Sequence, residues 1–141
     1  MDKEFESEIF LSIKENVIDC CFLTMNEAIN LSNRISKKFD LDFSKSFLWA
    51  DERASLISSY ENQWELRWHH LMGSISGLSN DLFLVISEDD HSPPPVLKIK
   101  KNDLTKLLDD SRIFEYFVTD SDLAFIVFDN HHNEILKLLP I

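Results

Sequence analysis

The sequence predicts an α+β fold in which N-terminal helices pack on a mostly antiparallel sheet of about four strands. Apolar residues before residue 80 recur every three or four positions, which is the spacing of a helix face. After residue 81 they come in short runs between turn-forming residues, as in strands. The chain has 141 residues and shows no repeat or linker. We therefore expect one domain over 1–141, helical over about 1–80 and strand-rich over about 81–141.

Two helices are expected before residue 40. The apolar face of the first is Phe5, Ile9, Ile13 and Val17, with Cys20 and Cys21 at its end. Thr24 and Glu27 have the spacing of a capping box, which starts a second helix. Its apolar face is Ala28, Leu31, Ile35 and Phe39. Lys37 and Lys38 near the end of this helix suit its dipole.

Residues 40–80 give weaker signals. Residues 47–49 fit either a short strand or the entry to a helix over Glu52–Ser58. Trp64, Trp68 and Leu71 lie on one face at helical spacing, which predicts a helix over Glu61–Ser74. Gly73 and Gly77 then interrupt the pattern.

The second half predicts strands separated by turns and one short helix. A nearly continuous apolar run from Asp81 predicts a central strand, and alternation over Val96–Lys100 predicts a second. The three prolines of Glu88–Pro95 make that stretch a turn. Asn102 is expected to cap a helix over 103–110. The remaining expected elements are strands at Phe114–Val118 and Leu123–Phe128, a turn at 119–122, and a last helix or edge strand at Glu134–Ile141. We expect helices to cover one face of this sheet.

The formal net charge is −11, from 25 acidic and 14 basic residues. Such a surface repels phosphate backbones and anionic membranes, so we expect neither nucleic acid nor a membrane as partner. A basic protein is the favoured partner. The N-terminus lacks the features of a signal peptide, and no apolar stretch is long enough to span a bilayer. The only two cysteines are adjacent and unsuited to a structural disulfide, so we expect a cytoplasmic protein.

Two glycines in the whole chain exclude the glycine-rich loops that bind phosphates and dinucleotides. No cofactor and no catalytic motif is expected. The histidines are the best candidates for a metal site, and Asp129, His131 and His132 could together hold one ion as the centre of a small metal-dependent enzyme. Neighbouring residues on a strand point to opposite faces, however. We therefore favour a turn in which Asn130 and the imidazoles hydrogen-bond to the backbone.

Acidic residues concentrate on the predicted turns and loops. Solvation explains most of them, because turns favour Asp. With few compensating bases, they also create a negative potential that steers a basic partner onto the surface. The candidate partner-binding residues are Glu88, Asp89, Asp90, Asp109, Asp110, Asp120 and Asp122.

Three segments carry a resemblance to a known family: FLVISEDD from Phe83, FEYFV at 114–118 and FDNHHN at 128–133. Over about its last sixty residues the chain resembles the small bacterial immunity proteins of polymorphic toxin and contact-dependent growth inhibition systems. The resemblance implies a non-enzymatic antitoxin that binds a cognate toxin, here expected to be a basic, nuclease-type domain. It implies no role for any single residue. Glu115, Tyr116, Asn130, His131 and His132 fit a cross-strand hydrogen-bond cluster equally well.

Two alternatives to an immunity protein stay open on the sequence. One is the small metal-dependent enzyme, and the other is a non-catalytic cytoplasmic scaffold whose acidity serves only solubility. The oligomeric state is also open, because strands rich in Phe can pair edge to edge.

Overall fold

The computed structural model describes residues 3–16, 18–45, 48–60, 66–87, 93–110, 114–130 and 132–141. The helices in these ranges are α1 (Lys3–Glu15), α2 (Met25–Phe39), α3 (Arg67–Ser74) and α4 (Lys101–Asp110), with a 3₁₀ turn, η1, at Leu48–Ala50. The strands are β1 (Cys20–Phe22), β2 (Ser55–Ser59), β3 (Asp81–Ile86), β4 (Val96–Lys100), β5 (Tyr116–Asp120), β6 (Ile126–Asp129) and β7 (Glu134–Leu138).

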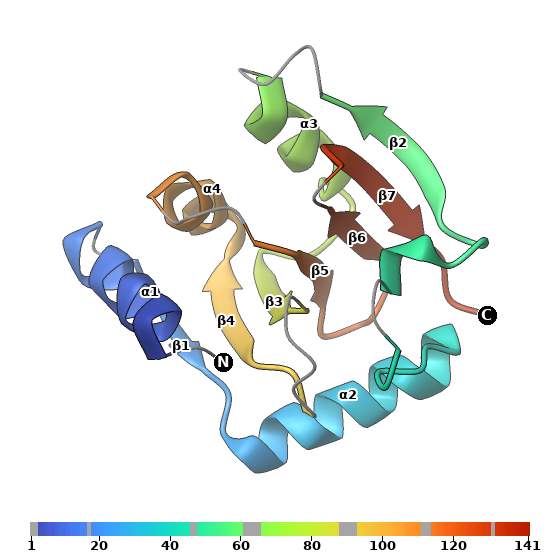
Figure 1. The fold of residues 1–141 in the computed structure, drawn as a ribbon, viewed down its shortest axis with the longest axis horizontal. Helices are drawn as coiled ribbons and strands as arrows, with labels where there is room; N and C mark the ends of the chain where they lie inside the picture. The colour runs from blue at the N-terminus through green and yellow to red at the C-terminus, as the bar shows by residue number, and fades with distance from the viewer. Residues whose placement is uncertain are drawn as a thin grey trace.

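All seven strands form one antiparallel sheet in the order β1-β4-β3-β5-β6-β7-β2 (Figure 1). The α+β class is confirmed, but the expected number of about four strands is wrong. The first added strand is β1, because the cysteines pair with β4 rather than ending a helix. The second is β2, which lies where a helix over Glu52–Ser58 was one of two alternatives. The third is β7, which lies inside the sheet between β6 and β2.

Helices cover both faces of the sheet, not one as expected. The helices α1, α3 and α4 pack on one face, and α2 crosses the other (Figure 1). The strands supply apolar side chains to both sides. In β3, Leu82, Leu84 and Ile86 enter the core under the three helices, whereas Val85 enters the core under α2. All five residues of β5 are buried, as expected for a central strand covered on both sides.

The second helix agrees with the sequence residue by residue. The Thr24 hydroxyl accepts from the Glu27 N–H at 3.2 Å, and Glu27 accepts from the Thr24 N–H at 2.9 Å, which completes the capping box. The four expected apolar residues are the buried residues of α2. The third helix is confirmed from Arg67 to Ser74, while 61–65 lie outside the described residues. Asn102 does not cap α4, since that helix already begins at Lys101.

The described helices are short. The longest, α2, has 15 residues and one apolar face. Within the ranges that the structure describes, no helix combines the length and apolarity needed to cross a bilayer.

Candidate functional site

Two of the segments singled out in the sequence lie side by side. Strand β5 contains the end of FEYFV and β6 contains the start of FDNHHN, and the two strands pair. In this register Tyr116 lies directly opposite Asp129. Opposite residues of an antiparallel pair point to the same face, so both side chains enter the core beneath α3. Of the residues expected to form a cross-strand hydrogen-bond cluster, Tyr116 enters a buried polar cluster at this place, whereas Asn130 belongs to a separate turn and Glu115 accepts from the Trp49 indole at 3.3 Å.

A buried ion pair forms the centre of this cluster. The guanidinium of Arg67, at the start of α3, donates to Oδ2 of Asp129 from Nη2 at 2.8 Å and from Nε at 3.2 Å. Arg67 is 6% exposed and Asp129 is 2% exposed. Removing two charges from water costs several kcal/mol per ion. Such a pair persists only where further hydrogen bonds compensate, and here two tyrosines supply them.

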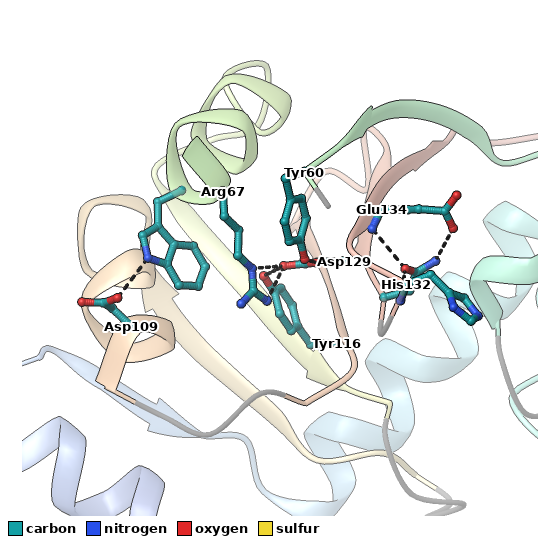
Figure 2. Close-up of polar contacts among 9 residues, drawn as sticks. Tyr60, Arg67, Asp109, Tyr116, Asp129, His132 and Glu134 are labelled. Atoms are coloured by element: carbon teal, nitrogen blue, oxygen red, sulfur yellow. Dashed lines mark hydrogen bonds and ion pairs between the residues drawn. The ribbon is translucent and has the colours of Figure 1, made fainter. Parts of the chain in front are cut away.

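Both tyrosine hydroxyls donate to the same carboxylate (Figure 2). Tyr116 donates to Oδ2 at 2.7 Å, and Tyr60 donates to Oδ1. Burial raises the pKa of both tyrosines well above the ordinary value, and the negative charge of Asp129 raises it further. Both phenols therefore stay protonated at neutral pH and act as donors.

Arg67 stays charged in this environment. Burial opposes its charged form, but the Asp129 carboxylate and the two tyrosines together outweigh burial, so the pKa of Arg67 is raised. Its guanidinium carbon also lies 4.5 Å from the ring centre of Trp68 and 5.3 Å from that of Tyr60, within the range of cation–π attraction. The Trp68 indole donates to Asp109 of α4 at 3.1 Å, which connects α3 to the neighbouring helix (Figure 2).

The hydrogen bonds of the Asp129 carboxylate lie within the fold and leave neither oxygen open to a substrate or a metal ion. Asp129 would need a free oxygen to act as a general base or a metal ligand. Its two oxygens instead accept four hydrogen bonds from three side chains, all nearly sealed from water. The network joins β5, β6, α3 and the residue after β2 at one buried point.

A second polar group follows β6 and forms a turn. The Asn130 amide oxygen accepts from the backbone N–H groups of His132 at 2.9 Å and Glu134 at 3.2 Å. Its amide nitrogen donates to the Glu134 carboxylate at 3.1 Å. Asn133 adopts the left-handed conformation, with φ of 59°, that such a turn requires. The predicted turn role of Asn130 is confirmed.

Of the residues of the metal hypothesis, Asp129 and His132 lie within the described ranges, and they do not form a metal-binding group there. The His132 ring packs edge-on against Trp49, with ring centres 5.2 Å apart, and Figure 2 shows it pointing away from the Asp129 carboxylate. His131 lies outside the described residues. Within the described ranges no group of three His, Cys, Asp or Glu side chains is placed to hold a metal ion. His70 bonds instead to the Ser58 hydroxyl, at 2.5 Å from Nδ1.

The cysteines occupy an edge strand. Cys20 is half-buried and Cys21 is exposed, and both lie on a strand rather than at the helix end expected from the sequence. Burial raises the pKa of the Cys20 thiol to about 11, and Cys21, Asp103 and Asp19 contribute in the same direction. Cys20 is therefore a neutral thiol at physiological pH, which is not a nucleophile.

The acids proposed to bind a partner have different environments. Glu88, Asp89 and Asp90 lie outside the described residues, as does the side chain of Asp110. Asp120 is buried, and its oxygens accept the backbone N–H groups of Ser79 and Ala124, so it stabilises a turn. Asp109 and Asp122 are exposed. They lie on α4 and on the turn between β5 and β6, so the structure does not gather them into one group.

Sequence reasoning missed two members of the buried network, Tyr60 and Arg67. One signal was available: Arg67 has Trp64 three positions before it and Leu71 four positions after it, so it lies beside the apolar face of the expected helix. A lone basic residue there predicts a buried charge that needs a carboxylate. The distance in sequence of 62 residues to Asp129 gave no indication of which carboxylate that would be.

Comparisons of this chain with protein-family models, with curated proteins and with solved structures find no match.

Removing one partner of the buried ion pair should be strongly destabilising. We expect Arg67→Met to lower the free energy of unfolding by about 3–5 kcal/mol, because it leaves the Asp129 charge buried without its counter-ion. Urea denaturation followed by circular dichroism measures this change. Arg53→Met is the control, since the ion pair of Arg53 with Asp51 is solvent-accessible. An effect of Arg67→Met no larger than that of Arg53→Met would contradict the role assigned to the network.

The buried tyrosines also predict loss of stability in alkali. Their pKa is raised in the folded state, so the folded chain retains protons that the unfolded chain loses. Their contribution is complete below about pH 10, the ordinary tyrosine pKa, and is lost as the pH rises further. Unfolding free energies from pH 8 to 11 should fall more steeply for the native protein than for the Tyr60→Phe/Tyr116→Phe variant. Parallel curves for the two proteins would be inconsistent with this account.

Proposed function

We propose that this chain is a cytoplasmic immunity protein that binds and neutralises a cognate bacterial toxin without catalysing a reaction. The observation that carries the proposal is the net charge of −11 on a chain of 141 residues. A negative surface of this size attracts a basic toxin domain at long range and accelerates its association. A nuclease-type toxin is the favoured class, because its basic surface is built to bind phosphates and accepts carboxylates in their place.

The conspicuous polar residues of the sequence motif support binding over catalysis. Asp129, Tyr116 and Asn130 are occupied within the fold, in the buried network and in the turn after β6. Their hydrogen bonds within the fold therefore explain why these polar residues occur together in the sequence. What remains for function is the outer surface, where the excess of acid lies.

The acidic surface that we assign to the toxin lies on α1 and α4. Glu4, Glu8 and Glu15 are exposed on α1 at the spacing of one helix face. Leu11 lies in the same row and is 55% exposed, which provides an apolar anchor among the charges. Helix α4 packs beside α1 and adds the exposed Asp109, one of the acids expected from the sequence to bind a partner.

The proposal is tested by recovering the partner. The immobilised chain, used as bait for its untagged partner in an extract of the source cell at low and high salt, should retain one basic, toxin-sized polypeptide in equal amount. Mass spectrometry identifies that polypeptide, and expression of its gene should be toxic unless this chain is co-expressed. Recovery of no partner, or a partner whose toxicity this chain does not relieve, would overturn the proposal.

Reversing the charge of the α1 surface should slow association. We expect Glu8→Lys/Glu15→Lys to lower the association rate with the recovered partner about tenfold at low salt, because electrostatic steering scales with local charge. Stopped-flow or surface plasmon resonance at two salt concentrations measures it. Asp42→Lys/Glu52→Lys is the control, since it reverses the same number of exposed acids away from α1 and α4. Equal rates for the two variants would show that α1 is not the contact.

A further inference from the structure

The last turns of α2 carry a group of basic side chains in a chain that is otherwise strongly acidic. Arg34, Lys37 and Lys38 are exposed, and their spacings of three and four positions place them on one face of the helix. They line a pocket of about 400 Å³ together with Asp122, Leu123 and Ile141. The side chains around this pocket therefore carry three positive charges and one negative charge.

Two of these cations are held in place by the turn between β5 and β6. The Arg34 guanidinium donates from Nη2 to the backbone carbonyl oxygen of Ser121 at 2.9 Å. The Lys38 ammonium donates to the backbone carbonyl oxygen of Asp122 at 2.8 Å. Both acceptors are uncharged, so they fix the two head groups without cancelling their charge. Each head group also keeps N–H donors for a further acceptor.

The third cation, Lys37, does not take part in holding this turn. It makes no hydrogen bond or ion pair with any residue that the structure describes. Within the same ranges, no carboxylate lies at ion-pair distance from Arg34 or Lys38 either. Like charges that are gathered in this way repel one another, and a bound anion relieves the repulsion.

We propose that this pocket binds the phosphate group of a small molecule through Arg34, Lys37 and Lys38. A phosphate presents several acceptor oxygens, and the planar fork of an arginine matches two of them, while the lysines add point charges. Because the Arg34 and Lys38 head groups are fixed before the ligand arrives, binding costs less side-chain entropy than at mobile side chains. The volume of the pocket lies in the range of small-molecule sites, about 300–1,000 Å³.

The net charge of −11 does not prevent an anion from binding at this place. At physiological ionic strength, charges in solvent are largely screened from one another beyond about 8 Å. Figure 1 shows the end of α2 on the opposite side of the molecule from α1, which carries exposed acids. The anion therefore responds mainly to the cations of the pocket. A long phosphate backbone would extend onto the acidic surface, so a small molecule is favoured over nucleic acid.

The backbone carbonyl groups at the end of α2 oppose the anion only weakly. The negative end of a helix dipole arises from terminal carbonyl groups that lack donors. Here the Ser36 carbonyl accepts from the Leu41 N–H at 3.2 Å, and the Lys38 carbonyl accepts from the Ile141 N–H at 3.0 Å. These hydrogen bonds reduce the negative potential beside the pocket.

Binding of pyrophosphate tests this inference. Isothermal titration calorimetry at low salt should show saturable binding with a dissociation constant of about 1 mM, as expected for a few charge-assisted hydrogen bonds at an open pocket. Lys37→Gln should weaken binding about tenfold, because it removes one such bond. The matched control is Lys14→Gln, which should bind as the native chain does. Lys14 is also an exposed lysine in the last turn of a helix, α1, and its loss changes the net charge equally.

A second anion tests the assignment to phosphate. Malonate, a dicarboxylate, should bind at least about tenfold more weakly than pyrophosphate, since it offers fewer oxygens and less charge to the same donors. Equal binding of malonate, no saturable binding of pyrophosphate up to about 10 mM, or equal affinities of Lys37→Gln and Lys14→Gln would overturn the inference. Both lysines are exposed, so the substitutions leave the core unchanged, and circular dichroism verifies folding. The result does not depend on the proposed toxin, because the titration contains only this chain and the anion.

Discussion

Asp129 is the last residue of β6, and its carboxylate is buried where water does not solvate it. The positions of several other elements depend on this constraint. A buried carboxylate needs a counter-ion and donors for its remaining lone pairs. Arg67 supplies the charge from α3, and Tyr60 and Tyr116 supply hydroxyls from the ends of β2 and β5. Since three of these groups lie 13 or more residues from Asp129, the network fixes the relative positions of elements that local sequence leaves unspecified.

Local signals explain which elements the sequence predicts well. Helix α2 was predicted from Thr24 to Phe39 because its cap and its apolar spacing lie within the helix itself. Strands β1 and β2 were missed for the opposite reason. Cys20–Phe22 and Ser55–Ser59 are short, lack regular alternation and become strands only by pairing with β4 and β7. Their conformation is decided by partners that lie far along the chain, so no window of residues contains the information.

The same distinction applies to the candidate site. The sequence drew attention to Tyr116, Asp129, Asn130 and His132 because they lie in two of the segments that carry the family resemblance, and because a carboxylate beside imidazoles is a candidate metal site. The turn role of Asn130 could be predicted, since its partners lie two and four residues away. The pairing of Asp129 with Arg67 could not, because 62 residues separate them. A cluster of polar residues in a single sequence is therefore better explained by buried groups that hydrogen-bond to one another than by catalysis.

Covering both faces of the sheet leaves the outer helix surfaces and the two sheet edges for binding. The surfaces at the two edges of the sheet differ in charge and polarity. At the β1 end, α1 and α4 present acids, which suit a basic partner approaching through solvent. At the β2 end, the strand is uncharged and the surface beside it is apolar. Because β1-β4-β3-β5-β6-β7-β2 is a single sheet, these two chemically different surfaces lie at opposite ends of one molecule.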